Sequence, residues 1–125
     1  MDHHRFSISK QVKSIKFAMN GMKILISEEH NARIHLLAAI CAIAAGFYFT
    51  ISLSEWMAII FSIGIVFSLE SINSSIEYIA DFISPEKHDK IMKIKDVSAA
   101  GVLFGAISAL IIGLIIFLPK LLHDA

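Results

Sequence analysis

Apolar and polar positions divide this chain into three long apolar stretches joined by polar segments. The third stretch, residues 97–118, holds 22 residues without a charge; at ~1.5 Å per residue it reaches ~33 Å as a helix, enough to cross the hydrocarbon of a bilayer. The second is apolar only over residues 56–69, too short to span, so its helix must continue through the acidic residues that follow. The pattern predicts membrane-spanning helices at about 34–53, 56–81 and 97–118.

A different pattern precedes the first stretch. Between residues 7 and 27 apolar residues recur at three- and four-residue spacing, which is one stripe of a helix: Val12, Ile15, Met19, Met22 and Ile26. Lys13, Lys16 and Lys23 lie on or near the flanks of that stripe, where long side chains can reach from a membrane interface into water. The sequence therefore predicts an amphipathic helix over about 9–28 on the membrane surface, which is compatible with packing against the spans.

Composition supports the same class of protein. The chain has 125 residues, of which 56% are hydrophobic and 18% charged, and its mean hydropathy is +0.70. A soluble domain this short could not bury so much apolar surface. We therefore expect an all-α integral membrane protein in which residues 1–125 form a single domain. Cys41 is the only cysteine, so no disulfide can form within the chain.

The basic residues predict how the chain crosses the membrane. Six lysines and arginines precede the first span, none lies between the first and second, four lie between the second and third, and one follows the third. Positive residues are retained on the cytoplasmic side. The N-terminus and the second connection are thus expected in the cytoplasm and the C-terminus outside.

The second span carries a polar stripe at its predicted cytoplasmic end. Because successive helical residues turn by ~100°, five polar side chains fall within about 100° of arc: Glu70, Asn73, Ser74, Glu77 and Asp81. A helix end emerging into water would explain Asp81. It does not explain Glu70, which lies ~10 Å deeper than Glu77, because ionisable residues at such depth are costly and usually functional.

The predicted topology brings further charged residues to the same membrane face. Glu28 and Glu29 precede the first span, and Lys95 and Asp96 precede the third. Mg²⁺ typically binds through one or two carboxylates plus substrate phosphates, so Glu29 and Glu77 are candidate metal ligands. Lysines could face phosphate oxygens, and Glu70 could accept a proton from the hydroxyl of a lipid. These are the parts that phosphoryl transfer requires.

These residues resemble those of a known family. The segment "ESINSSIEYIAD", the pair Lys95-Asp96 and an acidic residue at Glu29 are similar to the prokaryotic diacylglycerol kinase/undecaprenol kinase family. The resemblance implies a homotrimer in the bacterial cytoplasmic (inner) membrane, with active sites formed between subunits. It also implies transfer of the γ-phosphate of ATP to a lipid alcohol with Mg²⁺ as cofactor, and no nucleic acid partner.

By matched position the resemblance also implies residue roles. Glu70 would be the proton acceptor that meets the lipid substrate, with Asn73 in support, and Glu29 and Glu77 would hold the metal. The residues implied to contact ATP are Lys10, Phe17, Glu29, Glu77, Glu86, Lys87, His88, Lys95 and Asp96. Lys10 and Phe17 replace the arginine and tyrosine of enterobacterial diacylglycerol kinases, so the bidentate fork and the hydroxyl are lost.

The acceptor lipid stays open between diacylglycerol, which would give phosphatidic acid, and undecaprenol, which would give undecaprenyl phosphate. Asn31 and His35 in "EHNARIHL" resemble the undecaprenol kinases of Gram-positive bacteria, although such a histidine is more often an interfacial polar residue than a catalytic one.

Two alternatives and one open question accompany this hypothesis. A small oligomeric transporter or proton-conducting bundle would need polar residues across the whole membrane depth, whereas "WMAIIFSIGIVFSL" is nearly bare of them. An assembly subunit without chemistry leaves Glu70 unexplained. A stripe of small residues on the third span favours close helix packing, either within one subunit or between subunits: Gly101, Gly105, Ala109 and Gly113.

Overall fold

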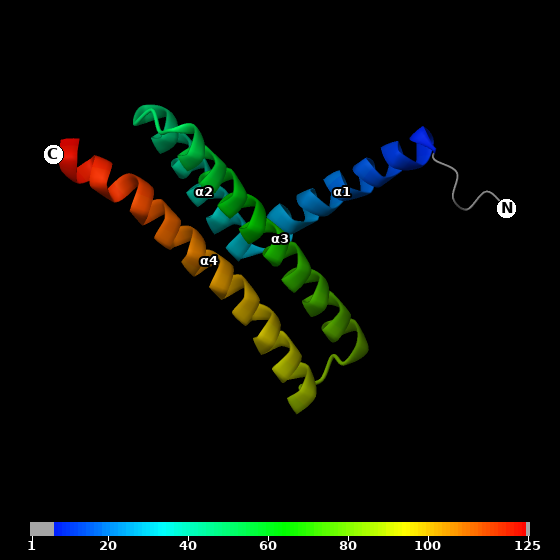
Figure 1. Ribbon diagram of the computed structural model, residues 1–125. Coiled ribbons are helices and arrows are strands. Elements are labelled where there is room, and N and C mark those ends of the chain that lie inside the picture. Colours follow the sequence, from blue (N-terminus) through cyan, green and yellow to red (C-terminus); the bar gives the residue numbers. More distant parts are fainter. Residues whose placement is uncertain (1–6, 125) are drawn as a thin grey trace.

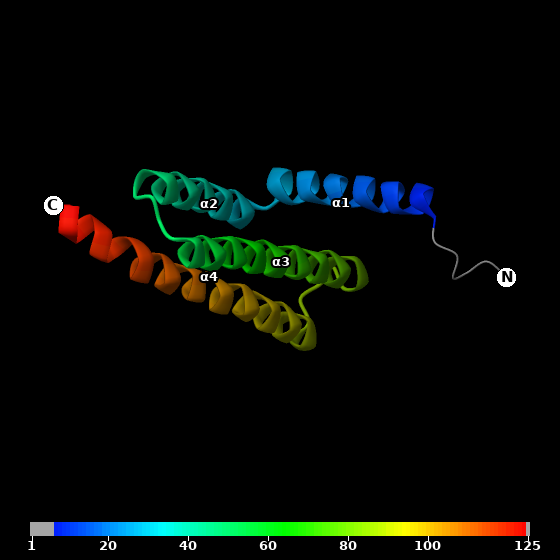
Figure 2. The ribbon, with the colours of Figure 1, turned by 45° about the horizontal axis from the view of Figure 1, so that its top comes forward.

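The computed structural model describes residues 7–124, and all regular structure in that part of the chain is helical. Four helices follow one another: α1 (Ile8–Glu28), α2 (His30–Tyr48), α3 (Leu53–Ile83) and α4 (Asp89–Asp124). Helices α2 and α4 both run antiparallel to α3, which lies between them (Figures 1 and 2). The N-terminal part of α1 extends away from these three helices.

Helices α2, α3 and α4 are each long and apolar enough to cross a membrane, with mean hydropathies of 1.4, 1.6 and 2.7 over their most apolar windows. The expected fold class, an all-α integral membrane protein with three spans and an N-terminal helix, is confirmed. Helix α3 continues unbroken through the acidic stripe to Ile83, as its short apolar part required.

The helix ends differ from the predicted span ends. Helix α2 stops at Tyr48 because Thr50 takes a φ of 47°, a left-handed conformation that cannot continue an α-helix. Helix α4 begins at Asp89 and runs through Pro119. Its first turns are polar and precede the apolar stretch. The apolar stretch predicts only the part of a helix that lies in the membrane, so it could not predict where α4 begins. Pro119 lacks a backbone N–H and so removes one helical hydrogen bond.

Arg33 fixes the junction between α1 and α2. Its Nε donates to the carbonyl oxygen of Ile26 at 2.9 Å, and its Nη2 donates to that of Ser27 at 2.7 Å. The last carbonyls of a helix have no partner within the helix, so Arg33 from the first turn of α2 closes the end of α1. The acidic pair Glu28 and Glu29 is thereby held at the start of the first span.

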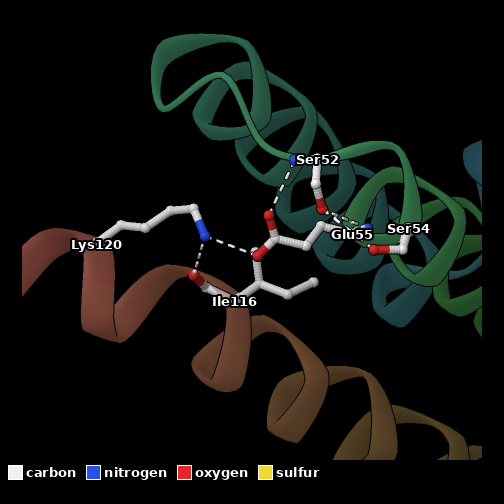
Figure 3. A network of polar contacts seen from close by, with 5 residues as sticks. All are labelled: Ser52, Ser54, Glu55, Ile116 and Lys120. Atoms are coloured by element: carbon white, nitrogen blue, oxygen red, sulfur yellow. Dashed lines mark hydrogen bonds and ion pairs between the residues drawn. The ribbon is translucent and has the colours of Figure 1, made fainter.

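An ion pair joins α3 and α4 at the opposite end of the bundle (Figure 3). Glu55 accepts from the backbone N–H of Ser52 at 2.9 Å, while its own N–H donates to the Ser52 hydroxyl at 3.2 Å, which is a capping box. The other oxygen of Glu55 lies 2.7 Å from Nζ of Lys120, which also donates to the carbonyl oxygen of Ile116 at 3.2 Å. This contact ties the start of α3 to the end of α4.

The apolar core lies at the same end, where Ile51, Ile59 and Ile116 are buried with Trp56 and Phe117 packed against them. Beyond this core, burial follows one face of α3 toward its C-terminal half. That face carries Ser62, Val66, Glu70, Asn73 and Ser74. The central helix is therefore apolar where it meets the core and polar where it meets the start of α2.

The small residues of the α4 stripe differ in what lies next to them. A Cβ built on Gly105 would lie 2.6 Å from Cδ1 of Leu69, so this glycine lets α3 and α4 approach within one subunit. At Gly101 and Gly113 a Cβ would meet no atom within 4 Å. Packing within the subunit thus explains Gly105 and leaves the other two glycines free of close neighbours.

Gly46 offers a test of this packing. A Cβ there would lie 2.6 Å from Cη2 of Trp56 and 3.1 Å from Cδ1 of Ile51, and a rigid indole cannot yield as a flexible side chain does. We expect Gly46→Ala to destabilise the protein by about 1–3 kcal/mol, the usual cost of overpacking. The measurement is thermal unfolding in detergent micelles, followed by the fluorescence of Trp56.

The matched control is Gly64→Ala, since a Cβ at Gly64 meets no atom within 4 Å. Alanine is also the better helix former, so this variant should unfold at the wild-type temperature or slightly above it. Equal unfolding temperatures for the two variants would contradict the close contact between α2 and Trp56.

Candidate active site

Glu70 is the largest side chain that the structure buries completely, with 1% of its surface exposed. It lies on the buried face of α3, one helical turn from Val66 and from Ser74. Its Oε1 lies 3.2 Å from Nε2 of His35 on α2, at ion-pair distance, and within residues 7–124 this oxygen accepts no hydrogen bond of good geometry. A carboxylate is thus enclosed between two membrane helices with an imidazole as its neighbour.

The polar stripe continues from Glu70 toward the end of α3. Asn73 and Ser74 are buried, and Nδ2 of Asn73 donates to Oε1 of Glu77 at 3.4 Å. Residues four apart on a helix share a face, so this contact keeps the amide and the carboxylate together. Glu77 is half-buried and connects the enclosed Glu70 with the exposed end of the helix.

Carboxylates from two parts of the chain meet at this end. Glu28 and Glu29, at the α1–α2 junction, act electrostatically on Tyr78 of α3 together with Glu77. Glu29 and Glu77 also act on Glu70. The two residues that the sequence singled out as metal ligands, Glu29 at the α1–α2 junction and Glu77 on α3, thus belong to the same end of the bundle.

The carboxylates at this end fit a hard cation that also binds water or phosphate oxygens. Among residues 7–124 no group of three or more histidine, cysteine or acidic side chains forms a ready-made metal cage. Mg²⁺ does not require one, because it binds through one or two carboxylates together with water and substrate phosphates. Glu29 and Glu77 are the two carboxylates at this end of the bundle that could serve such an ion.

Lys95, in the second turn of α4, forms an ion pair with Asp81 near the end of α3. The two side chains remain partly exposed, at 35% and 63% of their surfaces, so a further anion can reach the ammonium group. Asp96 is exposed beside it. The contact places a cation at the same end of the bundle as the carboxylates.

Several residues of the implied nucleotide site are not brought to this cluster. Lys10 and Phe17 lie on α1 and are exposed, Phe17 by 75%. Glu86, Lys87 and His88 lie in the exposed connection between α3 and α4. There Nδ1 of His88 accepts from the backbone N–H of Lys90 at 3.1 Å, so this imidazole helps to begin α4.

Sequence reasoning missed three residues that shape the site. Arg33 bonds the end of α1, and Tyr78 lies among the carboxylates. The Ser98 hydroxyl of α4 is buried without a hydrogen-bond partner in the described chain, as are Oδ1 of Asn73 and the Ser74 hydroxyl. Spacing could have found Ser98, which lies three residues after Lys95 and so on the same helix face. Buried polar atoms are normally bonded, so these are available to a ligand.

Two grooves adjoin the polar cluster. The first, of about 350 Å³, lies between α2, α3 and α4 and is almost wholly apolar; its lining includes His35, Ala39, Val66, Ala109 and Gly113. The second, of about 470 Å³, lies between α1 and α3 and is lined by serine hydroxyls and Tyr78 as well as apolar residues. The first groove reaches the carboxylate of Glu70 through His35, and the second reaches the polar stripe through Ser74; both grooves are mainly apolar.

Comparison with known proteins identifies the family. The family model described as prokaryotic diacylglycerol kinase matches residues 16–117, and the chain belongs to that family. It is 38% identical to the undecaprenol kinase of Bacillus subtilis over 118 residues, which cover 94% of this chain and 96% of the relative.

Two relatives carry the other acceptor in their names. The chain is 34% identical to a diacylglycerol kinase of Helicobacter pylori over 96 residues, covering 76% of this chain and 74% of the relative. It is 28% identical to a diacylglycerol kinase of Synechocystis over 110 residues, covering 87% of this chain and 63% of the relative. The protein is thus a lipid kinase of the membrane, an enzyme that passes a phosphoryl group from a nucleotide donor to a lipid.

Proposed function

We propose that this enzyme transfers the γ-phosphate of ATP, with Mg²⁺, to the hydroxyl of a membrane lipid alcohol, and that undecaprenol is its preferred acceptor over diacylglycerol. The observation that carries the proposal is the enclosed carboxylate of Glu70 beside an apolar groove that opens between membrane helices. An enclosed base suits a substrate that never leaves the bilayer. The preference for undecaprenol rests on the 38% identity with the Bacillus subtilis enzyme over nearly the whole of both chains.

Glu70 is the proton acceptor in this proposal. The lipid hydroxyl oxygen forms a bond to the γ-phosphorus, the bond from that phosphorus to the nucleoside diphosphate breaks, and the hydroxyl proton passes to Glu70. Phosphoryl transfer depends mainly on positioning and charge stabilisation. A single base beside correctly held phosphates is therefore enough for the protein's part in the reaction. Asn73 supports the site by holding Glu77.

Glu29 and Glu77 would hold the metal, which would neutralise phosphate charge when bound. Lys95 and Asp96, at the start of α4, contact the nucleotide, and Asp81 keeps Lys95 in place through its ion pair. Glu86, Lys87 and His88 lie outside the cluster, on the exposed connection at the same end of the bundle, and contact the nucleotide when it is bound. All these groups belong to the end of the bundle that the basic residues assign to the cytoplasm, where ATP is present.

Lys10 and Phe17 suit a site shared between subunits of a homotrimer. Both are exposed on α1, and neither joins the cluster of its own chain. The glycines at 101 and 113, which have no close neighbours, leave room for a second copy of α4 or α2 to approach. In this proposal residues 1–125 act as one membrane domain with the N-terminus in the cytoplasm and the C-terminus outside.

Glu70→Gln removes the base and keeps the shape of the side chain. We expect kcat to fall by about 10²- to 10⁴-fold, the usual contribution of a positioned acid or base. Affinity for Mg-ATP should stay within about twofold of wild type, because Glu70 does not touch the nucleotide in this proposal. Steady-state transfer and nucleotide titration in mixed micelles measure the two effects, and unimpaired turnover would remove Glu70 from the mechanism.

Glu77→Gln tests the metal ligand. The amide oxygen can still accept from Asn73, so packing is kept while the negative charge is lost. We expect the Mg²⁺ concentration for half-maximal activity and the KM for ATP each to rise about tenfold or more. Asp89→Asn, an exposed acidic residue in the first turn of α4, is the control and should leave both values unchanged. A wild-type Mg²⁺ requirement in Glu77→Gln would contradict the assignment.

The acceptor is tested by competition. Purified protein in mixed micelles receives labelled ATP with undecaprenol and diacylglycerol at equal mole fraction, and the two phosphorylated products are separated and counted. We expect undecaprenyl phosphate to predominate by about tenfold or more, an energetic difference of ~1.4 kcal/mol. Predominant phosphatidic acid would reverse the proposed preference and leave the lipid kinase activity intact.

A further inference from the structure

The contact between His35 and Glu70 joins α2 to α3 and links an enclosed side chain to a partly exposed one. Glu70 is enclosed, with 1% of its side chain exposed, whereas 20% of His35 is exposed. The same imidazole lines the apolar groove between α2, α3 and α4. His35 therefore stands between the carboxylate and the surface along which a lipid chain can lie.

The chemistry of the two groups defines the contact. An ionised carboxylate oxygen can only accept a hydrogen bond, so the contact with Nε2 at 3.2 Å is favourable when that nitrogen carries the proton, and it is not yet a hydrogen bond of good geometry. Within residues 7–124 this is the only ion pair of Glu70. A buried charge without a partner is strongly disfavoured, and an unheld carboxylate would also be free to turn about its last torsion.

We propose that His35 is a positioning residue for the acceptor half of the reaction. Its Nε2–H holds Oε1 of Glu70, so that the second carboxylate oxygen faces a hydroxyl arriving from the groove. Contacts of this kind are often long in the free enzyme and shorten when substrate binds. This inference rests on the proposed role of Glu70 as proton acceptor, and it assigns a function to a histidine that otherwise would only fill a helix interface.

A positioning role and a space-filling role of His35 predict different effects of replacing it with glutamine or with asparagine. The amide nitrogen of glutamine can occupy about the position of Nε2 in histidine, whereas that of asparagine is one methylene shorter and reaches only about as far as Nδ1. Both substitutes are polar and smaller than or similar in size to the imidazole. If His35 only fills space, the longer and shorter amides should differ little in turnover once stability is taken into account.

The experiment measures lipid phosphorylation by full-length His35→Gln and His35→Asn in mixed micelles, together with their affinity for Mg-ATP and their unfolding temperatures. We expect His35→Gln to keep kcat within about threefold of wild type and His35→Asn to lose about ten- to hundredfold, the range for one hydrogen bond to a charged group. The KM for ATP should stay within about twofold in both, because the nucleotide lies on the other side of Glu70.

Two controls separate positioning from folding. His30→Gln changes an exposed histidine one and a half turns earlier on α2 and should leave kcat unchanged. In a Glu70→Gln background, His35→Asn should cause no further loss, because residues that act as one unit are not additive.

Each outcome decides between the possibilities. Equal turnover of His35→Asn and wild type, with Glu70→Gln inactive, would overturn the role of His35 and leave the proposed function standing. An equal loss in both amide variants, in step with lower unfolding temperatures, would reduce His35 to packing and overturn the inference as well. Full activity of Glu70→Gln would instead refute the proposed base itself.

Discussion

The burial of one carboxylate is the constraint on which this structure depends. Glu70 sits on the central helix where three spans converge, with 1% of its side chain exposed. Enclosing a charge in apolar surroundings costs far more free energy than a surface contact returns, so the enclosure must be held by the rest of the fold. His35 supplies the partner, and the unbroken α3 supplies a rigid path from Glu70 to Glu77 at the polar end. The proposed function assigns the distance between those two carboxylates along the helix, ~10 Å, to the separation between a lipid hydroxyl and a soluble nucleotide.

Two polar contacts at opposite ends of the bundle keep that geometry. Arg33 closes the end of α1 and so fixes the α1–α2 junction that carries Glu29. The ion pair of Glu55 with Lys120 ties α3 to α4 beyond the core. Neither contact touches the reacting groups. Helices in a membrane gain little from further apolar burial, so their relative positions depend on close packing and on a few directed contacts such as these two.

The sequence predicted which segments are helical better than where the helices end. It also predicted the polar stripe of α3 but not the contact that His35 makes with it. The three apolar stretches follow from hydrophobicity, and each forms a long helix in the structure. A 100° turn per residue places Glu70 on a polar stripe, and the structure buries it. The early start of α4 at Asp89 does not follow, because a helix outside the bilayer need not be apolar. The end of α1 at Glu28 agrees with the helix predicted over about 9–28, although no glycine or proline marks it. The contact of His35 with Glu70 needed the packing of α2 on α3, which spacing within one helix cannot supply.

The division of the polar residues between enclosed and exposed positions explains why a chain of 125 residues can serve as a kinase of lipids. In the proposed function the acceptor side consists of Glu70, His35 and the apolar groove, which one chain brings together. The proposed donor side is more open: the side chain of Lys95 is 35% exposed beside Asp81, and Phe17 on α1 is 75% exposed. A membrane supplies the first substrate at high local concentration and in a fixed orientation, so its site can be narrow and preformed. A nucleotide comes from water, so the side of the site that receives it can stay open to the solvent.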